Sequence, residues 1–158
     1  DRSIGRRTYN ARAETVAEKP SYRTAWRQRQ FCLVPLGRFF EPCWETGKAV
    51  PWSIHRQDGE PFTVAAIWDR WTERATGEIV VSFSMLTINA EEHPIMGRFH
   101  RPGDERRSLV VVPPSRWTDW LSATPDTVRA MLAEMPVAEF TSESVMGLSS
   151  APAQASFL

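Results

Sequence analysis

The sequence predicts an α+β fold whose core is a twisted, mostly antiparallel, barrel-like sheet flanked by short helices. Five or six short runs rich in Val, Ile, Phe and Thr are separated by Gly, Pro and Asp-Gly, which is typical of a set of short strands. Helix-like segments occur near the ends of the chain, which favours an antiparallel sheet. The 158 residues have the length of one domain, so residues 1–158 are expected to form a single domain.

The strands can be placed by their apolar patterns and by the turn residues between them. They are expected at residues 31–36, 39–42, 52–55, 62–68, 78–88 and 109–112. Asp58-Gly59 is a typical two-residue hairpin turn, so the two strands that flank it are expected to pair. The polar segment 89–107 is expected to be a loop.

Three short helices are expected, and each has a candidate N-cap residue. The caps are Ser21 before YRTAWRQRQ, Ser115 before WTDWL, and Thr124 before a helix that runs to about Met135. Residues 1–20 lack a clean periodicity and are expected to form an Arg-rich loop. The Ser- and Ala-rich residues from about 144 to 158 are expected to form a loose tail.

Charge is distributed unevenly along a chain whose formal net charge is zero. Residues 1–30 hold seven Arg and one Lys against three acids, a local net of +5, whereas the chain from residue 118 onward holds five acids against one Arg, a net of −4. This polarity is compatible with one polyanion-binding face, although a GC-rich genome would also favour Arg. There is no apolar run of about 18 residues and no signal-peptide core, so neither a membrane partner nor secretion is expected.

The two cysteines, Cys32 and Cys43, have neither a metal-ligand spacing nor the pattern of a disulfide framework. Cys32 lies within an apolar strand and is expected to be a small buried side chain. Three dispersed His residues do not complete a zinc site. The sequence therefore predicts no metal and no cofactor, and the reduced thiols indicate a cytoplasmic protein.

Three segments carry ionisable or polar residues that packing alone does not require. Glu41 follows two Phe and precedes Pro-Cys-Trp, so burial is expected to raise its pKa and to suit it to proton transfer; a surface Glu at a strand end is the alternative. His100 lies in a Gly/Pro loop among four Arg, as a candidate acid or base or as a solvated loop residue. If residues 9–15 are extended, Asn10, Arg12 and Glu14 point to one side.

The order and spacing of these segments resemble the SOS-response-associated peptidase (SRAP) family. The matching segments are NARAET (10–15), CLVPLGRFFEPCW (32–44), Ala66 to Trp68, Thr87, and Phe99-His100 through Arg107, and together they cover about residues 8–121. The family has an aromatic-Glu-Trp step where this chain has Phe-Glu-Pro. The loop after His100 also carries extra residues, Pro102 to Glu105.

The resemblance implies an α+β domain with a positively charged groove that binds single-stranded DNA and traps abasic sites covalently. The implied nucleophile is an N-terminal Cys, whose amine and thiol condense with the sugar aldehyde to give a thiazolidine. Asn10 would hold the aldehyde oxygen, while Glu41 and His100 would move protons. The implied DNA-backbone contacts are Arg12, Thr87 and either Arg106 or Arg107. A monomer that associates with the bacterial nucleoid is expected.

The chain begins Asp-Arg-Ser instead of Cys-Gly-Arg, so it is expected to lack an N-terminal segment that supplies the nucleophile. Two other functions use the same residues. One is a thiol peptidase that cleaves its own leader or other substrates with Glu41 and His100. The other is a non-catalytic DNA-binding module that uses only the arginines.

Overall fold

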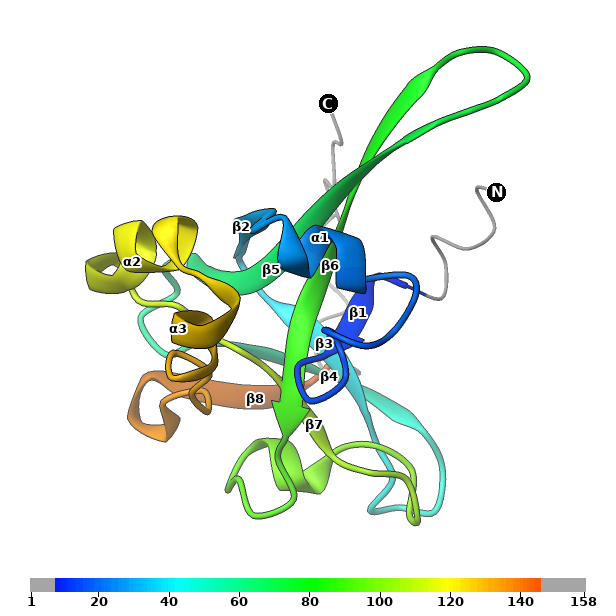
Figure 1. The fold of residues 1–158 in the computed structure, drawn as a ribbon. Helices are drawn as coiled ribbons and strands as arrows, with labels where there is room; N and C mark the ends of the chain where they lie inside the picture. Colours follow the sequence, from blue (N-terminus) through cyan, green and yellow to red (C-terminus); the bar gives the residue numbers. More distant parts are fainter. Residues whose placement is uncertain (1–7, 146–158) are drawn as a thin grey trace.

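The computed structural model describes residues 8–145, whose strands form two sheets (Figure 1). The larger sheet has the order β1-β6-β5-β2, and β7 also pairs with β6. Its strands are β1 (Asn10–Arg12), β2 (Phe31–Leu36), β5 (Phe62–Thr72), β6 (Ile79–Asn89) and β7 (Arg107–Leu109). Only β1 runs parallel to its neighbour; the other described pairs in this sheet are antiparallel.

The smaller sheet consists of β3 (Phe39–Cys43), β4 (Val50–Arg56) and β8 (Phe140–Ser144), in the order β3-β4-β8. Both of its strand pairs are antiparallel. The predicted α+β class and its mostly antiparallel sheet are therefore confirmed. Over residues 8–145 the strands do not close into a barrel, because they are divided between these two sheets.

The Asp58-Gly59 hairpin prediction is wrong. Gly59 does adopt the positive φ of a tight turn, at 77°. The flanking strands β4 and β5 belong to different sheets, so the turn carries the chain from one sheet to the other. Arg56 forms a salt bridge with Asp58 and another with Glu139, which ties this turn to the segment before β8.

Two of the three predicted helices, α1 and α3, are shorter than predicted, and only one of the three expected N-caps is correct. They are α1 (Arg23–Arg27), α2 (Trp117–Ser122) and α3 (Pro125–Arg129), together with the 3₁₀ turns η2 (Met96–Arg98), η3 (Pro114–Arg116) and η4 (Val137–Glu139). Thr124 caps α3 in a reciprocal capping box with Thr127. Ser21 and Ser115 do not cap, because α1 begins after Tyr22 and Ser115 lies inside η3.

Three further predictions need correction at the level of single segments. The expected loop over residues 1–20 contains β1. Only Leu109 of the expected strand 109–112 lies in β7; Val110 and Val112 are buried, and Val111 forms an isolated bridge with Val64. The expected tail begins inside β8, which ends at Ser144, and its residues 146–158 lie outside the described part of the chain.

Two apolar clusters fill the interior. One gathers Trp26, Phe31 and Trp120 where α1 and α2 pack on the larger sheet. The buried indole of Trp120 donates to the carbonyl of Cys32 at 2.9 Å, so its polar atom is satisfied. The other cluster gathers Phe62 of the larger sheet, Phe140 of the smaller sheet and Phe99, which follows η2. It anchors Phe99, the residue next to His100.

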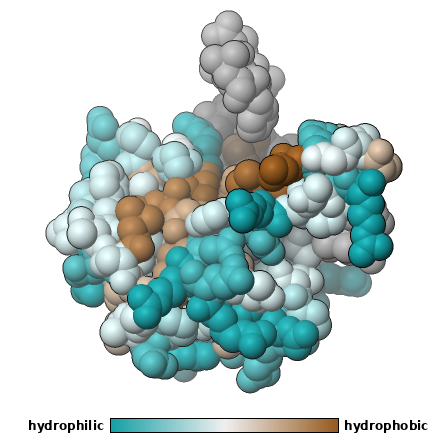
Figure 2. Space-filling model, turned by 45° about the horizontal axis from the view of Figure 1, so that its top comes forward, coloured by the Kyte–Doolittle hydropathy of each residue, from teal (hydrophilic) through white to brown (hydrophobic). Residues whose placement is uncertain are grey.

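The far ends of β5 and β6 form a twisted ribbon that projects from the body (Figure 1). On this ribbon Trp68, Ile79, Val81 and Phe83 are exposed. With this end turned forward, Figure 2 shows apolar side chains grouped among hydrophilic ones. Within residues 8–145 no helix is long and apolar enough to cross a membrane.

Candidate functional site

The parallel pairing of β1 with β6 builds one wall of the site. Asn10 lies opposite Met85, and Arg12 lies opposite Thr87. Because side chains alternate along a strand, Asn10 and Arg12 point to the same face while Ala11 is buried on the other. Directly opposite residues share a face, so the Thr87 side chain stands beside Arg12. The expected grouping of Asn10 and Arg12 is therefore present.

The opposite wall is formed by β3 and by the loop that carries His100. Cys43 and Phe99 form a β-bridge, and the backbone N–H of His100 donates to the carbonyl of Pro42 at 3.0 Å. These contacts place the His100 Nδ1 atom 3.6 Å from Oε2 of Glu41. The other ring nitrogen, Nε2, lies 3.1 Å from the carbonyl oxygen of Arg107. The ring is thus held between a carboxylate and a backbone carbonyl.

His100 has a backbone φ of 70°, in the left-handed region that non-glycine residues seldom adopt. Such a conformation is retained where the surrounding structure determines it, and it occurs often at functional sites. Here the buried ring of the preceding residue, Phe99, and the bond from the His100 N–H to Pro42 both hold the backbone on the N-terminal side of His100.

The two walls enclose a cavity of about 220 Å³. It is lined by Asn10, Arg12, Glu41, Thr87, His100, Arg107, Ser108 and Leu109. Six of the seven site residues predicted from the sequence therefore line one cavity. Arg106 does not, because its guanidinium bonds the carbonyls of Gly97 and Asp104. A larger cavity of about 500 Å³ lies around Trp117 and Pro113, and none of those six residues lines it.

Burial raises the pKa of Glu41 above its ordinary value, and the nearby His100 opposes part of that rise. The raised pKa follows the expectation drawn from the apolar neighbours of Glu41. The raised pKa increases the fraction of molecules in which Glu41 is protonated, and so able to donate a proton, near neutral pH. Glu41 and His100 in contact thus form a pair of groups suited to passing a proton to and from a bound molecule.

The raised pKa makes a prediction about stability. The folded state favours the protonated form of the Glu41 carboxyl more than the unfolded state does. The contribution of Glu41 to the free energy of unfolding is therefore greatest below the ordinary Glu pKa, and it decreases as pH rises from that value through the higher folded-state pKa. Glu41→Gln removes this loss. We expect the variant to have a higher Tm than the parent at pH 8 and a similar Tm at pH 4, measured by thermal denaturation. A variant with a lower Tm at pH 8 would contradict this.

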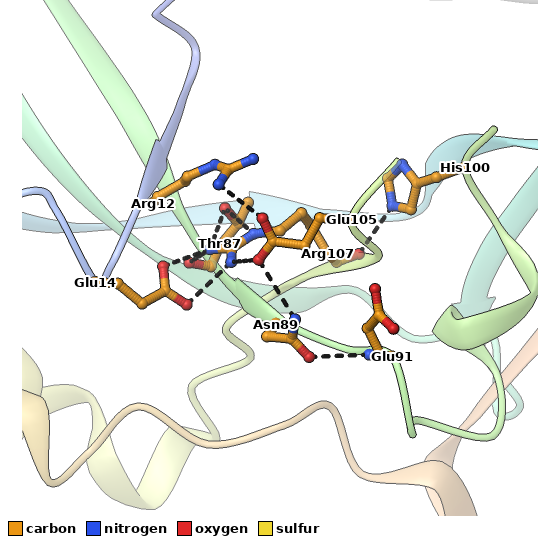
Figure 3. A network of polar contacts seen from close by, with 8 residues as sticks. All are labelled: Arg12, Glu14, Thr87, Asn89, Glu91, His100, Glu105 and Arg107. Carbon is orange, nitrogen blue, oxygen red and sulfur yellow. Dashed lines mark hydrogen bonds and ion pairs between the residues drawn. The ribbon is translucent and has the colours of Figure 1, made fainter. Parts of the chain in front are cut away.

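Arg107 is the centre of a polar network at the base of the cavity (Figure 3). Its side chain is only 11% exposed. Nε and Nη2 donate to the Thr87 hydroxyl, and Nη2 also donates to the Thr87 carbonyl at 2.6 Å. Glu14 receives a two-pronged contact of 3.0 and 2.7 Å from Nη1 and Nη2. Nη1 also contacts Glu105 at 2.7 Å.

Burial alone would raise the pKa of Glu14, but the hydrogen bond from Arg107, backbone hydrogen bonds and the charge of Arg107 together outweigh it and lower that pKa overall. The hydrogen bond from Arg107 is the largest cause lowering the pKa of Glu105. Both carboxylates are therefore ionised at neutral pH, and they neutralise much of the positive charge of the site.

Sequence analysis did not identify Glu105, Ser108 or Leu109 as part of the site. Glu105 falls among the extra residues of the loop after His100, but it stands two residues before Arg107, a spacing that places side chains on one side of an extended chain. Glu14 was expected to extend the line of Asn10 and Arg12 along one strand. The strand ends at Arg12, and Glu14 reaches Arg107 from the following turn.

Neither cysteine lines this cavity. Both thiols are free, and burial raises the pKa of Cys32 to about 11, so this thiol is protonated at neutral pH. Among the described residues no group of three His, Cys, Asp or Glu side chains could hold a metal ion.

The chain matches the family model described as "SOS response associated peptidase (SRAP)" over residues 1–148. It is similar to two abasic site processing proteins of Bacillus subtilis. YobE is 26% identical, with 96% of this chain and 67% of YobE covered, and YoaM is 24% identical, with 96% and 65% covered. The chain thus spans about two thirds of the length of these curated relatives.

Solved structures show the same fold. A crystal structure of a Bordetella bronchiseptica protein is 38% identical with a TM-score of 0.82, over 86% of this chain and 64% of the other. One from Bacteroides thetaiotaomicron is 26% identical with a TM-score of 0.76, over 90% and 60%. The family match covers nearly the whole sequence, including every residue that lines the cavity. The chain belongs to the SRAP family.

Proposed function

We propose that this chain provides the DNA-binding and proton-transfer site of a protein that traps abasic sites in single-stranded DNA. The observation that carries the proposal is the cavity itself, in which an amide, a carboxyl–imidazole pair and two arginines converge. The names of the Bacillus subtilis relatives, abasic site processing proteins, support the same substrate.

The size of the cavity supports an unpaired substrate. A volume of about 220 Å³ accommodates a sugar and part of a phosphate, but not a nucleotide stacked inside a duplex. Enzymes that do chemistry on a nucleobase flip the nucleotide out of the stack or act on single strands, and a reaction at the sugar carbon that carried the base needs similar access. A sugar that has lost its base needs no room for one.

The chemistry requires an aldehyde, an amine and a proton carrier. A primary amine adds to the aldehyde of the ring-opened sugar, loses water and gives an imine; a neighbouring thiol then adds to the imine carbon and closes a thiazolidine. The Asn10 amide would donate to the aldehyde oxygen. Glu41 and His100 would deliver the proton that leaves with the water and accept one from the incoming amine.

The arginines would hold the DNA backbone. Guanidinium groups bind phosphate through paired N–H bonds, and a hydroxyl such as that of Thr87 adds a further bond. Arg12 is 58% exposed and lies at the cavity rim, and Arg107 lies at its base.

The nucleophile proposed from the family resemblance is an N-terminal Cys, so the test uses the protein translated from its natural start codon. It is incubated with a single-stranded oligonucleotide that carries one abasic site, and adduct is scored on a denaturing gel. We expect adduct with this oligonucleotide and none with the intact one. Glu41→Gln and His100→Gln should slow adduct formation about 100-fold or more, the usual contribution of a general acid or base.

Glu143→Gln is the matched control, because Glu143 lies in β8 outside the cavity. It should react like the parent. If the parent forms no adduct, the covalent proposal fails; salt-dependent binding without adduct would indicate the non-catalytic module. Removal of leader residues, detected by mass spectrometry of the N-terminus and lost in His100→Gln, would indicate the peptidase instead.

A further inference from the structure

One carboxylate bridges the two cationic side chains of the site. Oε2 of Glu105 lies 2.7 Å from Nη1 of Arg12, and Oε1 lies 2.7 Å from Nη1 of Arg107 (Figure 3). The Asn89 amide donates to Oε1 at 3.4 Å. Two oxygens of one anionic group therefore meet two guanidinium groups, as two oxygens of a phosphate would.

Arg107 has no unused nitrogen for a further anion in this arrangement. Its Nε donates to Thr87, Nη1 contacts both Glu14 and Glu105, and Nη2 contacts Glu14 and Thr87. A phosphate can bind Arg107 only if one of these partners leaves.

The charges of the cluster cancel. Arg12 and Arg107 are each positive, and the two carboxylates that contact them, Glu14 and Glu105, are each negative. A DNA phosphate that approached this cluster would meet no net attraction until one carboxylate moved away.

Displacement of Glu105 would release both arginines, whereas displacement of Glu14 would release only a contact to Arg107. Glu14 belongs to the turn after β1, where the N–H of Ala13 donates to the Thr87 carbonyl at 2.9 Å and fixes the backbone. Glu105 belongs to the loop between His100 and β7, which contains Gly103 at a φ of 90°. Rotation of the Glu105 side chain toward solvent would free Arg12 and one N–H group of the Arg107 Nη1 atom, while Glu14 still held Arg107 in place.

We propose that Glu105 occupies the phosphate position between Arg12 and Arg107 and must be displaced when a DNA strand binds. Glu105 thereby sets how strongly the site binds DNA and limits binding of weakly held anions. This inference rests on the proposed function, because it assigns Glu105 a role at the same DNA site.

The test compares Glu105→Gln with Asp104→Asn in the protein translated from its natural start codon. Both changes remove one negative charge from the same loop, but only Glu105 contacts the two arginines. Binding of a fluorescent oligothymidine without abasic sites is measured by anisotropy across a salt series, so no covalent step contributes. We expect Glu105→Gln to bind about three- to tenfold more tightly at low salt, the scale of a partly exposed ion pair.

Salt dependence separates competition from a general charge effect. In the parent, added salt weakens the contacts between the arginines and DNA, which lowers affinity. It also weakens the ion pairs of Glu105 with the two arginines, which makes Glu105 easier to displace and partly offsets the loss of affinity. Glu105→Gln lacks these ion pairs, so its plot of log affinity against log salt should be steeper by less than one unit. Asp104→Asn should keep the slope of the parent.

A double-mutant cycle adds a second readout. If Glu105 masks Arg12, then Arg12→Ala should reduce affinity more in the Glu105→Gln background than in the parent. Glu105→Gln affinity equal to or below that of the parent, or a gain matched by Asp104→Asn, would overturn the proposal. Failure of the parent and of every variant to bind any single strand would instead remove the proposed function, and this inference with it.

Discussion

Replacement of Arg107 by alanine is expected to lower the free energy of unfolding by about 3 kcal/mol and to abolish adduct formation. Removing one partner of a buried ion pair costs roughly 3–5 kcal/mol, and the partial exposure of Glu14 and Glu105 places this case at the lower end. For a chain of this size, that loss corresponds to a decrease in Tm of about 6–12 °C. Urea denaturation and the adduct gel measure the two effects.

Arg107→Lys separates charge from geometry. Lysine keeps the positive charge but cannot reach Thr87 and Glu14 together, because it lacks the planar fork of the guanidinium. We expect it to recover little of the lost stability. Arg106→Ala is the control, since Arg106 points to the carbonyls of Gly97 and Asp104 and not into the cavity. Normal stability in Arg107→Lys would show that charge alone is sufficient at this position.

The existence of most strands could be predicted from the sequence, but their pairing could not. The β-branched and aromatic runs that became β2, β5 and β6 mark extended, half-buried segments. Burial does not determine which strands pair. Ser53 and Ile54 are neighbours in β4 whose side chains point to opposite faces, and both are fully buried, so their burial pattern would fit many partner strands; in the structure β4 pairs with β3 and β8. The strand β8 was missed because FTSES contains one large apolar residue.

The candidate site could be predicted as separate residues but not as a site without the family resemblance. Asn10, Glu41 and His100 come from distant segments, and the contacts that gather them are the parallel β1–β6 pairing and the Cys43–Phe99 bridge. No local sequence pattern encodes either contact. The choice between Arg106 and Arg107 likewise required the structure, because adjacent residues on an extended chain point to opposite sides.

A second large effect is expected at His93, which is 2% exposed and supports the loop that carries His100. Its Nδ1 accepts the backbone N–H groups of Ile95 and Met96 at 3.2 and 3.1 Å, so the ring proton lies on Nε2 and is donated to the Met135 carbonyl at 2.7 Å. His93→Ala removes the partner of three backbone groups, two of them in buried hydrogen bonds and one in a part-buried one, and opens a cavity. We expect a loss of about 3 kcal/mol in the free energy of unfolding.

The same change should slow adduct formation, because the loop held by His93 continues through η2 and Phe99 to His100. Glu92→Ala is the matched control; Glu92 is the exposed neighbour of His93 in the same turn, and its loss should change neither stability nor rate. Chemical denaturation gives the first quantity and the time course of the adduct gel gives the second. The opposite result would be a His93→Ala variant that loses stability but forms adduct at the rate of the parent. That result would show that the contacts to Pro42 and Phe99 are sufficient to position His100, and that His93 does not contribute through the loop.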